Sequence, residues 1–419
     1  MQANSVARMI SYVLVASLLC FLYTCKAQWT AVDCPNACVC EMSEWSDPAP
    51  PHRTADLNLV DCGNLELKTV PKIPQGAQKL ELDNNRFEDL DATLRSIGQS
   101  SEVADVTLRR NKIRSFEVNF TLANIVRLNL DENEIATLDL TTLNGFPNLQ
   151  ELSLQGNNVS ELRVASGEFV ANDSDKWQRE SNSSLGEFGN LRVLRLDSNK
   201  IDSLGWLNNS VQLRSILVLS LAGNVLKVPR LGANSFSIAR NLSALILTEM
   251  RIRVIDAQAF ENLFHLQSLD LDGNDLETVP TDALAHLVSL RYLNLNGNKL
   301  FHLNPFDFYN LPSIETIDLT QLPRLTLIDD KAFCNLPQLR ELLLYNNHRL
   351  TYVAGDAFVD CPKLETLDLH NTMVEIVSPE TQRKLTALRK LYLGNNPINC
   401  NCMMMWAKRW LPGMQPFQW

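Results

Sequence analysis

The sequence lacks the short motifs that mark many hydrolases, zinc proteases and nucleotide-binding enzymes. It has no G-x-S-x-G turn, no H-E-x-x-H zinc motif and no G-x-x-x-x-G-K-[ST] phosphate loop. Its six histidines are scattered. Asp368 and His370 share a strand face, but no serine or cysteine nucleophile accompanies them. We therefore predict that the protein is not an enzyme, needs no cofactor or metal and has no small-molecule substrate.

Positive charge is also in short supply. The chain has 38 lysines and arginines against 48 aspartates and glutamates, a net charge of −10. An acidic protein repels phosphate and sulfate groups, which argues against nucleic acids and acidic glycans as partners. Beyond the N-terminal segment there is no run of 18 apolar residues, so we expect no other membrane span.

The N-terminal segment has the pattern of a secretory signal. Arg8 precedes a nearly unbroken apolar run over residues 10–23, and Ala27 offers a cleavage point before Gln28. An uncleaved signal anchor is the alternative, but the short run favours cleavage. We predict a signal peptide over 1–27 and a secreted protein.

A repeat dominates the rest of the chain. The pattern L-x-x-L-x-L-x-x-N-x-L occurs thirteen times, usually 24 or 25 residues apart, as in residues 266–276 and 290–300. Its asparagine position, or a substitute, falls at residues 85, 111, 133, 157, 199, 224, 250, 274, 298, 322, 347, 372 and 396. This fixed period predicts a solenoid, in which no repeat can bury its apolar face alone.

Each repeat also alternates like a β-strand. Residues five and three before the asparagine should point inward, and residues six, four and two before it should point outward. We call the outward places positions −6, −4 and −2. Stacked strands would form one parallel sheet, with the asparagine side chain bonding to buried loop backbone. Met250 and Leu322 cannot supply that bond and Thr372 can do so only in part, which predicts irregular or weaker coils there.

A second apolar column lies fourteen residues before the asparagine. It holds Phe236, Phe260, Phe308, Phe333 and Phe358, with Leu284 in the remaining place. We expect stacked rings on the outer wall to space the coils more widely than the strands do, which makes the sheet the concave face.

Eight cysteines remain after signal removal, an even number in an oxidising compartment. Four of them, Cys34, Cys38, Cys40 and Cys62, precede the repeats, and their C-x-C spacing favours disulfides over a zinc site. They would seal the exposed edge of the first repeat. Cys334 and Cys361 predict a disulfide between neighbouring coils, with two buried thiols as the alternative.

The cysteine cluster and the repeats together resemble the extracellular leucine-rich-repeat family of animals, which includes Slit proteins and Toll-type receptors. The resemblance implies the pairs Cys34–Cys40 and Cys38–Cys62. It also implies an α/β-type solenoid, a leucine-rich-repeat horseshoe with a parallel β-sheet on its concave face and irregular or short helical segments on its convex face.

The resemblance extends only partly to a C-terminal cap. Cys400 and Cys402 match the opening of the family's cap, but its two further cysteines do not follow. These two therefore stay reactive, pair with another chain or lack partners in a fragment, and we favour a fragment or shortened product.

The chain accordingly divides into four parts. We predict the signal at 1–27, an N-terminal cap at 28–73, repeats at 74–398 and a partial C-terminal cap at 399–419. The interval from Asn157 to Asn199 is 42 residues, so an insertion near 163–187 should form a surface loop.

Side chains at the outward positions suggest where a partner binds. The predicted glycosylation sites Asn119, Asn158, Asn172, Asn182, Asn208 and Asn241 avoid these positions, which leaves the concave face bare. The predicted binding residues are Ile246, Asp270, Asp272, Tyr292, Asn294, Asp318, Leu343, Tyr345, Asp368, His370 and Tyr392. Carboxylates interleaved with tyrosines suit a protein whose surface is basic and partly apolar.

These features predict a secreted leucine-rich-repeat protein that binds an extracellular or cell-surface protein through its concave face. Two alternatives stay open. One is a truncated ectodomain of a single-pass receptor or adhesion protein at the plasma membrane, which requires a downstream span missing from this chain. The other is a structural component of the extracellular matrix.

Overall fold

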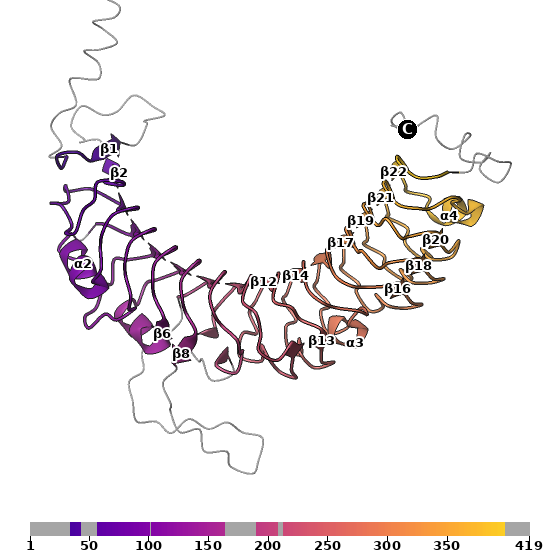
Figure 1. Ribbon diagram of the computed structural model, residues 1–419, viewed down its shortest axis with the longest axis horizontal. Helices are drawn as coiled ribbons and strands as arrows, with labels where there is room; N and C mark the ends of the chain where they lie inside the picture. The colour runs from indigo at the N-terminus through magenta and orange to yellow at the C-terminus, as the bar shows by residue number, and fades with distance from the viewer. Residues whose placement is uncertain (1–33, 43–56, 101, 164–189, 208–212, 399–419) are drawn as a thin grey trace, which may run out of the picture.

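The structure is a computed structural model that describes residues 34–42, 57–100, 102–163, 190–207 and 213–398. The signal peptide, most of the insertion, the partial C-terminal cap with Cys400 and Cys402, and the sequons at Asn172, Asn182 and Asn208 lie outside the described residues. The described residues form an arched solenoid in which each repeat is one coil (Figure 1). The predicted horseshoe is therefore confirmed.

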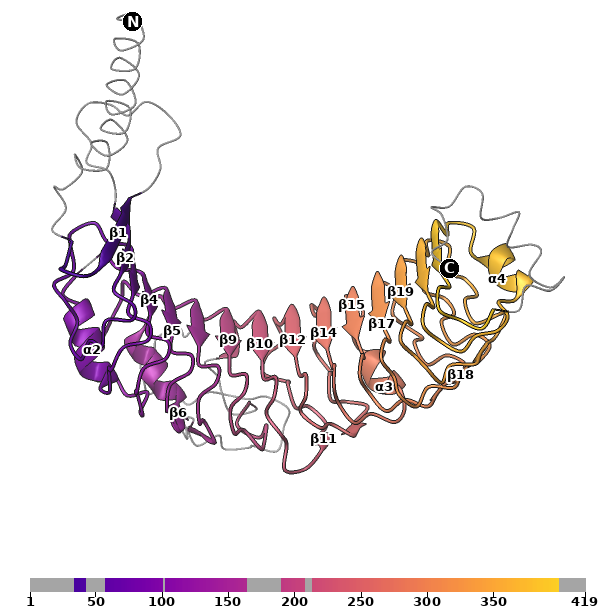
Figure 2. The same ribbon diagram turned by 45° about the horizontal axis from the view of Figure 1, so that its top comes forward.

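The concave face is one continuous sheet, which has 15 strands in the described part of the chain. Figure 2 shows these strands side by side along the inside of the arch. The repeats contribute β3 (Lys79–Glu81), β4 (Asp105–Thr107), β5 (Arg127–Asn129), β7 (Glu151–Ser153), β9 (Val193–Arg195), β10 (Val218–Ser220), β12 (Ala244–Ile246), β14 (Ser268–Asp270), β15 (Tyr292–Asn294), β17 (Thr316–Asp318), β19 (Glu341–Leu343), β21 (Thr366–Asp368) and β22 (Lys390–Tyr392). Each strand pairs in parallel with those of the coils beside it, as the repeat spacing predicts.

The N-terminal cap adds two strands to this sheet. Strand β1 (Val39–Met42) pairs antiparallel with β2 (Leu57–Asp61), and β2 then pairs in parallel with β3. Disulfides join Cys34 to Cys40 and Cys38 to Cys62, the pairing that the resemblance implies. Strand β1 thereby covers a sheet edge that would otherwise offer unpaired backbone groups to other chains.

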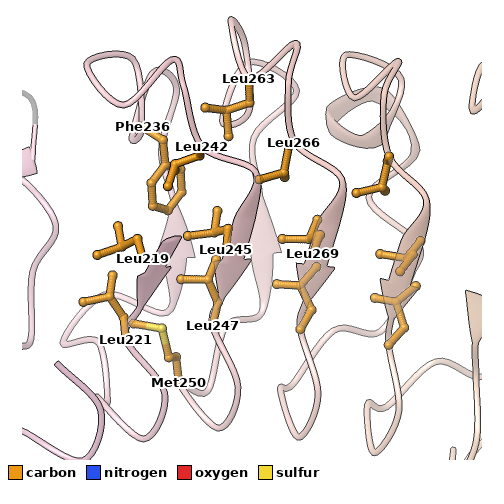
Figure 3. Close-up of a cluster of buried hydrophobic side chains, with 14 of the residues drawn as sticks. Leu219, Leu221, Phe236, Leu242, Leu245, Leu247, Met250, Leu263, Leu266 and Leu269 are labelled. Carbon is orange, nitrogen blue, oxygen red and sulfur yellow. The ribbon is translucent and has the colours of Figure 1, made fainter. Parts of the chain in front are cut away.

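The core consists of leucine columns that run from coil to coil. Leu219, Leu245 and Leu269 are in register on neighbouring strands, and all three are fully buried. Figure 3 shows them beside a second column that includes Leu221 and Leu247. Each leucine is covered by the coils on both sides, so burial is complete only within the stack.

The outer wall carries the predicted column of phenylalanines. Ring centroids are 6.1 Å apart between Phe236 and Phe260, 5.0 Å between Phe308 and Phe333, and 5.7 Å between Phe333 and Phe358. Neighbouring strands are only about 4.8 Å apart. The outer wall is therefore longer than the sheet, which curves the sheet into the concave face.

Asparagine side chains join each coil to the preceding one. The Asn274 Nδ2 group donates to the Leu271 carbonyl of its own coil at 2.9 Å and to the Leu247 carbonyl of the preceding coil at 2.8 Å. Its Oδ1 accepts from the Ile252 N–H at 2.9 Å. The residue before it, Gly273, has a φ of +65° and turns the chain inward. Amide bonds to the preceding coil recur at Asn85, Asn111, Asn133, Asn157, Asn199, Asn224, Asn298, Asn347 and Asn396.

The coils without this asparagine keep their strand pairing. Where Met250 stands, the Leu226 N–H reaches the Met250 backbone carbonyl at 3.4 Å. The Thr372 hydroxyl donates to the Leu369 carbonyl at 3.1 Å, which replaces part of the amide's role. Strands stay in register at these coils and at Leu322. The strands of these coils are therefore regular, because ladder bonds and leucine contacts on both sides hold the register, and the weaker stability of these coils stays a prediction.

The convex side has short helices and small sheets, as the resemblance implies. The helices are α2 (Leu90–Ile97), the 3-10 helix η1 (Leu140–Gly145), α3 (Thr281–Leu284) and α4 (Pro379–Lys384). The small sheets pair β6 (Thr137–Asp139) with β8 (Glu161–Arg163), β11 (Arg230–Leu231) with β13 (Val254–Ile255), and β18 (Leu327–Ile328) with both β16 (His302–Leu303) and β20 (Tyr352–Val353). None of the helices in the described residues has the length and apolar character needed to cross a membrane.

Cys334 and Cys361 are free thiols, so the predicted disulfide between them was wrong. Phe333 and Phe358 occupy equivalent places in adjacent coils, but Cys334 follows the first by one residue and Cys361 follows the second by three. The two cysteines are thus out of register. The buried Cys361 thiol donates instead to the Phe333 carbonyl at 2.8 Å, and burial raises its pKa to about 12.

Replacing one ladder asparagine tests its contribution to stability. We expect Asn274→Leu to lower the free energy of unfolding by about 3 kcal/mol, because it removes the side-chain partner of the Leu247 and Leu271 carbonyls and of two buried N–H groups. Urea unfolding followed by circular dichroism measures the change. Gln267→Leu, on an exposed side chain of the same coil, is the control. Equal unfolding midpoints for the two variants would contradict the assigned role.

Candidate protein-binding face

The eleven predicted binding residues lie on one continuous surface. Strand register places Asp270, Asn294, Asp318, Leu343 and Asp368 in a single row at position −4, which Ile246 and Tyr392 extend at its two ends. The remaining four occupy positions −6 and −2 of the same coils. We call this surface, from β12 to β22, the C-terminal concave face.

Three carboxylates gather on this face. Burial raises the pKa of Asp270, and the neighbouring charges of Asp272 and Asp318 raise it further. The pKa of Asp272 is raised in the same way, by burial and by the charge of Asp318. Within the described segments no group of three histidine, cysteine or carboxylate side chains is placed to hold a metal ion. Because the charge of Asp318 raises the pKa of both Asp270 and Asp272, the carboxylates repel one another in the free protein.

Nearby cations are paired elsewhere. Lys299 contacts the Asp275 carboxylate at 2.6 Å, and Arg291 contacts Glu315 at 3.0 Å. No lysine or arginine among the described residues forms an ion pair with Asp270, Asp272 or Asp318. The charge of the three aspartates is thus available to a ligand.

The N-terminal half of the concave face is different, because its charges neutralise one another. Arg127 contacts Asp105 at 2.5 Å, Arg110 contacts Glu132 at 2.7 Å, and Arg195 is paired with Glu151. Exposed pairs of this kind contribute little to stability. They do cancel the local field, so uncompensated charge is found on the C-terminal half.

Aspartates at position −2 show the same contrast. In the N-terminal half, Asp131 Oδ1 accepts from the Ser153 hydroxyl at 2.6 Å and from the Gln155 N–H at 2.8 Å, both in the next coil. In the C-terminal half the next coil has Asn294 where Ser153 would be, and Asp272 lacks a matching pair of donors. Its carboxylate therefore contributes less than that of Asp131 to holding neighbouring coils together.

Aromatic side chains stand beside the carboxylates. The rings of Tyr345 and His370 are stacked with centroids 4.8 Å apart, and His370 Nδ1 lies 2.6 Å from Asp368 Oδ1. Tyr292 and Tyr392 are 36% and 46% exposed. Burial and the charges of the nearby aspartates, Asp318 first, raise the pKa of Tyr292 to about 12. Exposed tyrosines offer both apolar area and a hydroxyl to a protein partner.

Aspartate and asparagine side chains in the row at position −4 also stabilise the ends of their strands, which the repeat pattern alone does not reveal. Asp270, Asp318 and Asp368 each accept, through Oδ1, the backbone N–H two residues later, at 3.0–3.1 Å. Asn294 and Asn129 do the same at 2.9 Å. This bond holds the strand end, and it explains why aspartate and asparagine recur at the position in both halves of the chain.

Asn294 offers little side-chain surface to a partner. It is only 8% exposed, because it lies in register between Asp270 and Asp318 and uses its Oδ1 within the turn. Its side chain separates the two carboxylates. Its role in binding stays a prediction.

Two residues that the sequence analysis did not single out lie on the floor of the face. The Oδ1 atom of Asn296 and the Oγ1 atom of Thr320 are buried and have no hydrogen-bond partner in the described part of the chain. Both stand at position −2, between Asp272 and Tyr345. In the sequence, only the polar character of the residues at position −2 could have pointed to these two side chains.

Three of the predicted glycosylation sites fall in the described residues. Asn119 and Asn241 are exposed and Asn158 is half-buried. All three stand away from positions −6, −4 and −2, so a sugar on any of them would leave the face uncovered. Glycosylation itself stays a prediction.

The C-terminal coils match a known family model. The model described as "Leucine rich repeat" matches residues 240–300, 290–348 and 343–398. Human leucine-rich repeats and immunoglobulin-like domains protein 3 is 28% identical over 215 residues, which are 50% of this chain and 17% of that protein. Bovine keratocan is 27% identical over 253 residues, which are 57% of this chain and 60% of that protein. The chain thus covers less than two thirds of each relative.

Solved structures share the fold. A chain of the mouse RP105/MD-1 complex superposes with a TM-score of 0.64 at 23% identity, covering 81% of this chain and 54% of that chain. At this identity the likeness shows the solenoid architecture. The relatives and the fold are those of scaffolds for protein interaction.

Neutralising one aspartate tests the repulsion on the face. Asp270 has a raised pKa in the folded state, so the folded protein carries an unfavourable charge at pH 7. This cost falls as the pH drops and is absent well below the unfolded-state pKa of about 3.9. We therefore expect Asp270→Asn to raise the urea unfolding midpoint at pH 7 and to make no difference near pH 3.

Asp275→Asn is the matched control with the opposite sign. A hydrogen bond from Lys299 lowers the pKa of Asp275, so its charged form stabilises the fold above pH 4. The same substitution should lower the midpoint at pH 7. A loss of stability in Asp270→Asn as large as in Asp275→Asn would contradict the repulsion.

Proposed function

This chain is a leucine-rich-repeat protein, and from that premise we propose that it is secreted and binds an extracellular or cell-surface protein through the C-terminal concave face. The observation that carries the proposal is the cluster of Asp270, Asp272 and Asp318, which has no cationic partner among the described residues and is bordered by tyrosines. Binding requires no catalysis, and we propose none.

Charge complementarity selects a basic partner. Asp270 and Asp272 have raised pKa values because they are partly buried near like charges. A lysine or arginine brought to the face would relieve the repulsion and replace lost hydration with a direct charge–charge contact. Rows of like charge also accelerate the encounter with an oppositely charged protein.

The shape and composition of the face favour a protein over a small ligand. The sheet is open and curved, and its contact groups extend over the coils from β12 to β22. Tyr292, Tyr345 and Tyr392 supply rigid aromatic area of the kind that contributes most at protein interfaces. The similar mouse solenoid was solved in a complex, RP105/MD-1, which supports a protein partner for this fold.

An ectodomain of a membrane-anchored protein is the second candidate. The alignment with human leucine-rich repeats and immunoglobulin-like domains protein 3 covers 17% of that protein, so similar repeats occur inside much longer chains. Sequencing the transcript beyond the codon for Trp419 distinguishes the two. An apolar span encoded there would indicate a membrane-anchored receptor, and a stop codon would indicate a secreted protein.

Reversing charge on the face tests the proposal. The mature chain is used to capture partners from an extracellular fraction, and the affinity for the captured protein is then measured by surface plasmon resonance. We expect the triple variant Asp270→Lys, Asp318→Lys and Asp368→Lys to weaken binding at least about a hundredfold, since each reversed charge costs about 1 kcal/mol or more.

A second triple variant separates a local contact from the effect of net charge. Asp282→Lys, Asp330→Lys and Glu375→Lys make the same change in charge at exposed side chains away from the concave face. This variant should bind within about threefold of the unaltered protein. If both triple variants bind as tightly as the unaltered chain, the proposed face is wrong.

A further inference from the structure

Two neighbouring oxygens on the C-terminal concave face lack partners. Thr320 is 1% exposed, and its Oγ1 has no hydrogen-bond partner among the residues that the structure describes. Asn296 Oδ1, in the preceding coil, is buried and without a partner as well. The two coils are joined directly, because the Gly297 N–H donates to the Thr320 carbonyl at 3.1 Å. Buried polar atoms are almost always paired, so two adjacent exceptions point to a donor that the free protein lacks.

Negative charge surrounds these oxygens. Asp318 precedes Thr320 by two residues and lies on the same outward side. Its Oδ1 accepts a hydrogen bond from the Thr320 N–H at 3.0 Å. Asp272 stands at position −2 in the coil before Asn296. The phenol of Tyr292 is near enough to Asp318, Asp270 and Asp272 for their charges to act on its titration. The surroundings therefore offer acceptors and aromatic area.

We propose that Asp272, Asn296, Asp318 and Thr320, with Tyr292 beside them, form a cradle for one arginine side chain of the protein partner. We call these five residues the arginine cradle. The inference rests on the proposed function, since it names the group that the concave face receives.

The set of acceptors fits a guanidinium better than an ammonium. A guanidinium presents five N–H donors in a planar fork, and it stacks on aromatic rings. The cradle supplies two carboxylates and two unpaired oxygens from adjacent coils, which lie about 4.8 Å apart. A lysine would bring three donors on one nitrogen, which cannot reach acceptors spread over several coils equally well.

Other occupants fit less well. A phosphate or sulfate is disfavoured, because the carboxylates of Asp272 and Asp318 would repel its negative charge. Calcium takes six to eight oxygens at close range. No group of three metal-ligating side chains occurs within the segments that the structure describes. A flexible cation with several N–H donors remains the best match.

The test uses two peptide probes, hexa-arginine and hexalysine, each with blocked ends and a neutral fluorophore. Their affinities for the full chain are measured by fluorescence anisotropy at physiological salt. We expect hexa-arginine to bind about tenfold more tightly than hexalysine, since the added hydrogen bonds are together worth about 1.4 kcal/mol. Thr320→Val should remove most of that preference while leaving the hexalysine affinity unchanged.

Thr248→Val is the matched control, because it makes the same change at position −2 three coils earlier. It should leave the arginine preference intact. Asp318→Asn should weaken both peptides, and arginine more. Circular dichroism and the urea midpoint establish that each variant is folded. The cradle is overturned if the two peptides bind equally, or if Thr320→Val keeps the preference.

The triple charge-reversal variant distinguishes failure of the cradle from failure of the proposed function. If the cradle is wrong but the face binds basic proteins, the Asp270→Lys, Asp318→Lys, Asp368→Lys variant still loses both peptides. If neither peptide binds the unaltered chain, or if the triple variant binds both as well as the unaltered chain, both proposals are overturned.

Discussion

The hydrogen bond from each asparagine amide to the carbonyl of the preceding coil holds the backbone of two repeats together. Without it, the turn that leaves the sheet would bury carbonyl and N–H groups that have no partner. Asn274 shows the full pattern, with bonds to Leu247, Leu271 and Ile252. The bond pairs backbone groups of neighbouring coils, while strand pairing and leucine contacts keep the coils in register even where Met250 or Leu322 replaces the asparagine.

The same register creates the proposed binding surface. Strand residues alternate between core and solvent, so the inward leucines are constrained by packing while positions −6, −4 and −2 are free to vary. The chain uses this freedom differently in its two halves. Arginines neutralise carboxylates near β5 and β9, whereas Asp270, Asp272 and Asp318 have no such partners within the described segments. A face that tolerates repulsion between like charges has a lower stability and a higher affinity for a cationic ligand.

Features governed by short-range pattern could be predicted from the sequence. The leucine period predicted the coils and the outward rows, and the phenylalanine column predicted the curvature. Features that depend on how neighbouring side chains meet could not. Cys334 and Cys361 are close in repeat spacing but out of register, so no disulfide forms. The burial of Asn294 and of the Thr320 hydroxyl depends on the reach of adjacent side chains, which a single repeat does not reveal.

The central claim is that the C-terminal concave face is the surface in contact with the partner. Hydroxyl-radical footprinting of the complex with the captured protein tests it directly, because exposed tyrosines report on both sides of the solenoid. Oxidation of Tyr292, Tyr345 and Tyr392 should fall on binding, while Tyr309 and Tyr352, which are exposed away from the concave sheet, should be unaffected. Protection of Tyr309 and Tyr352 with no change at the concave tyrosines would contradict the account.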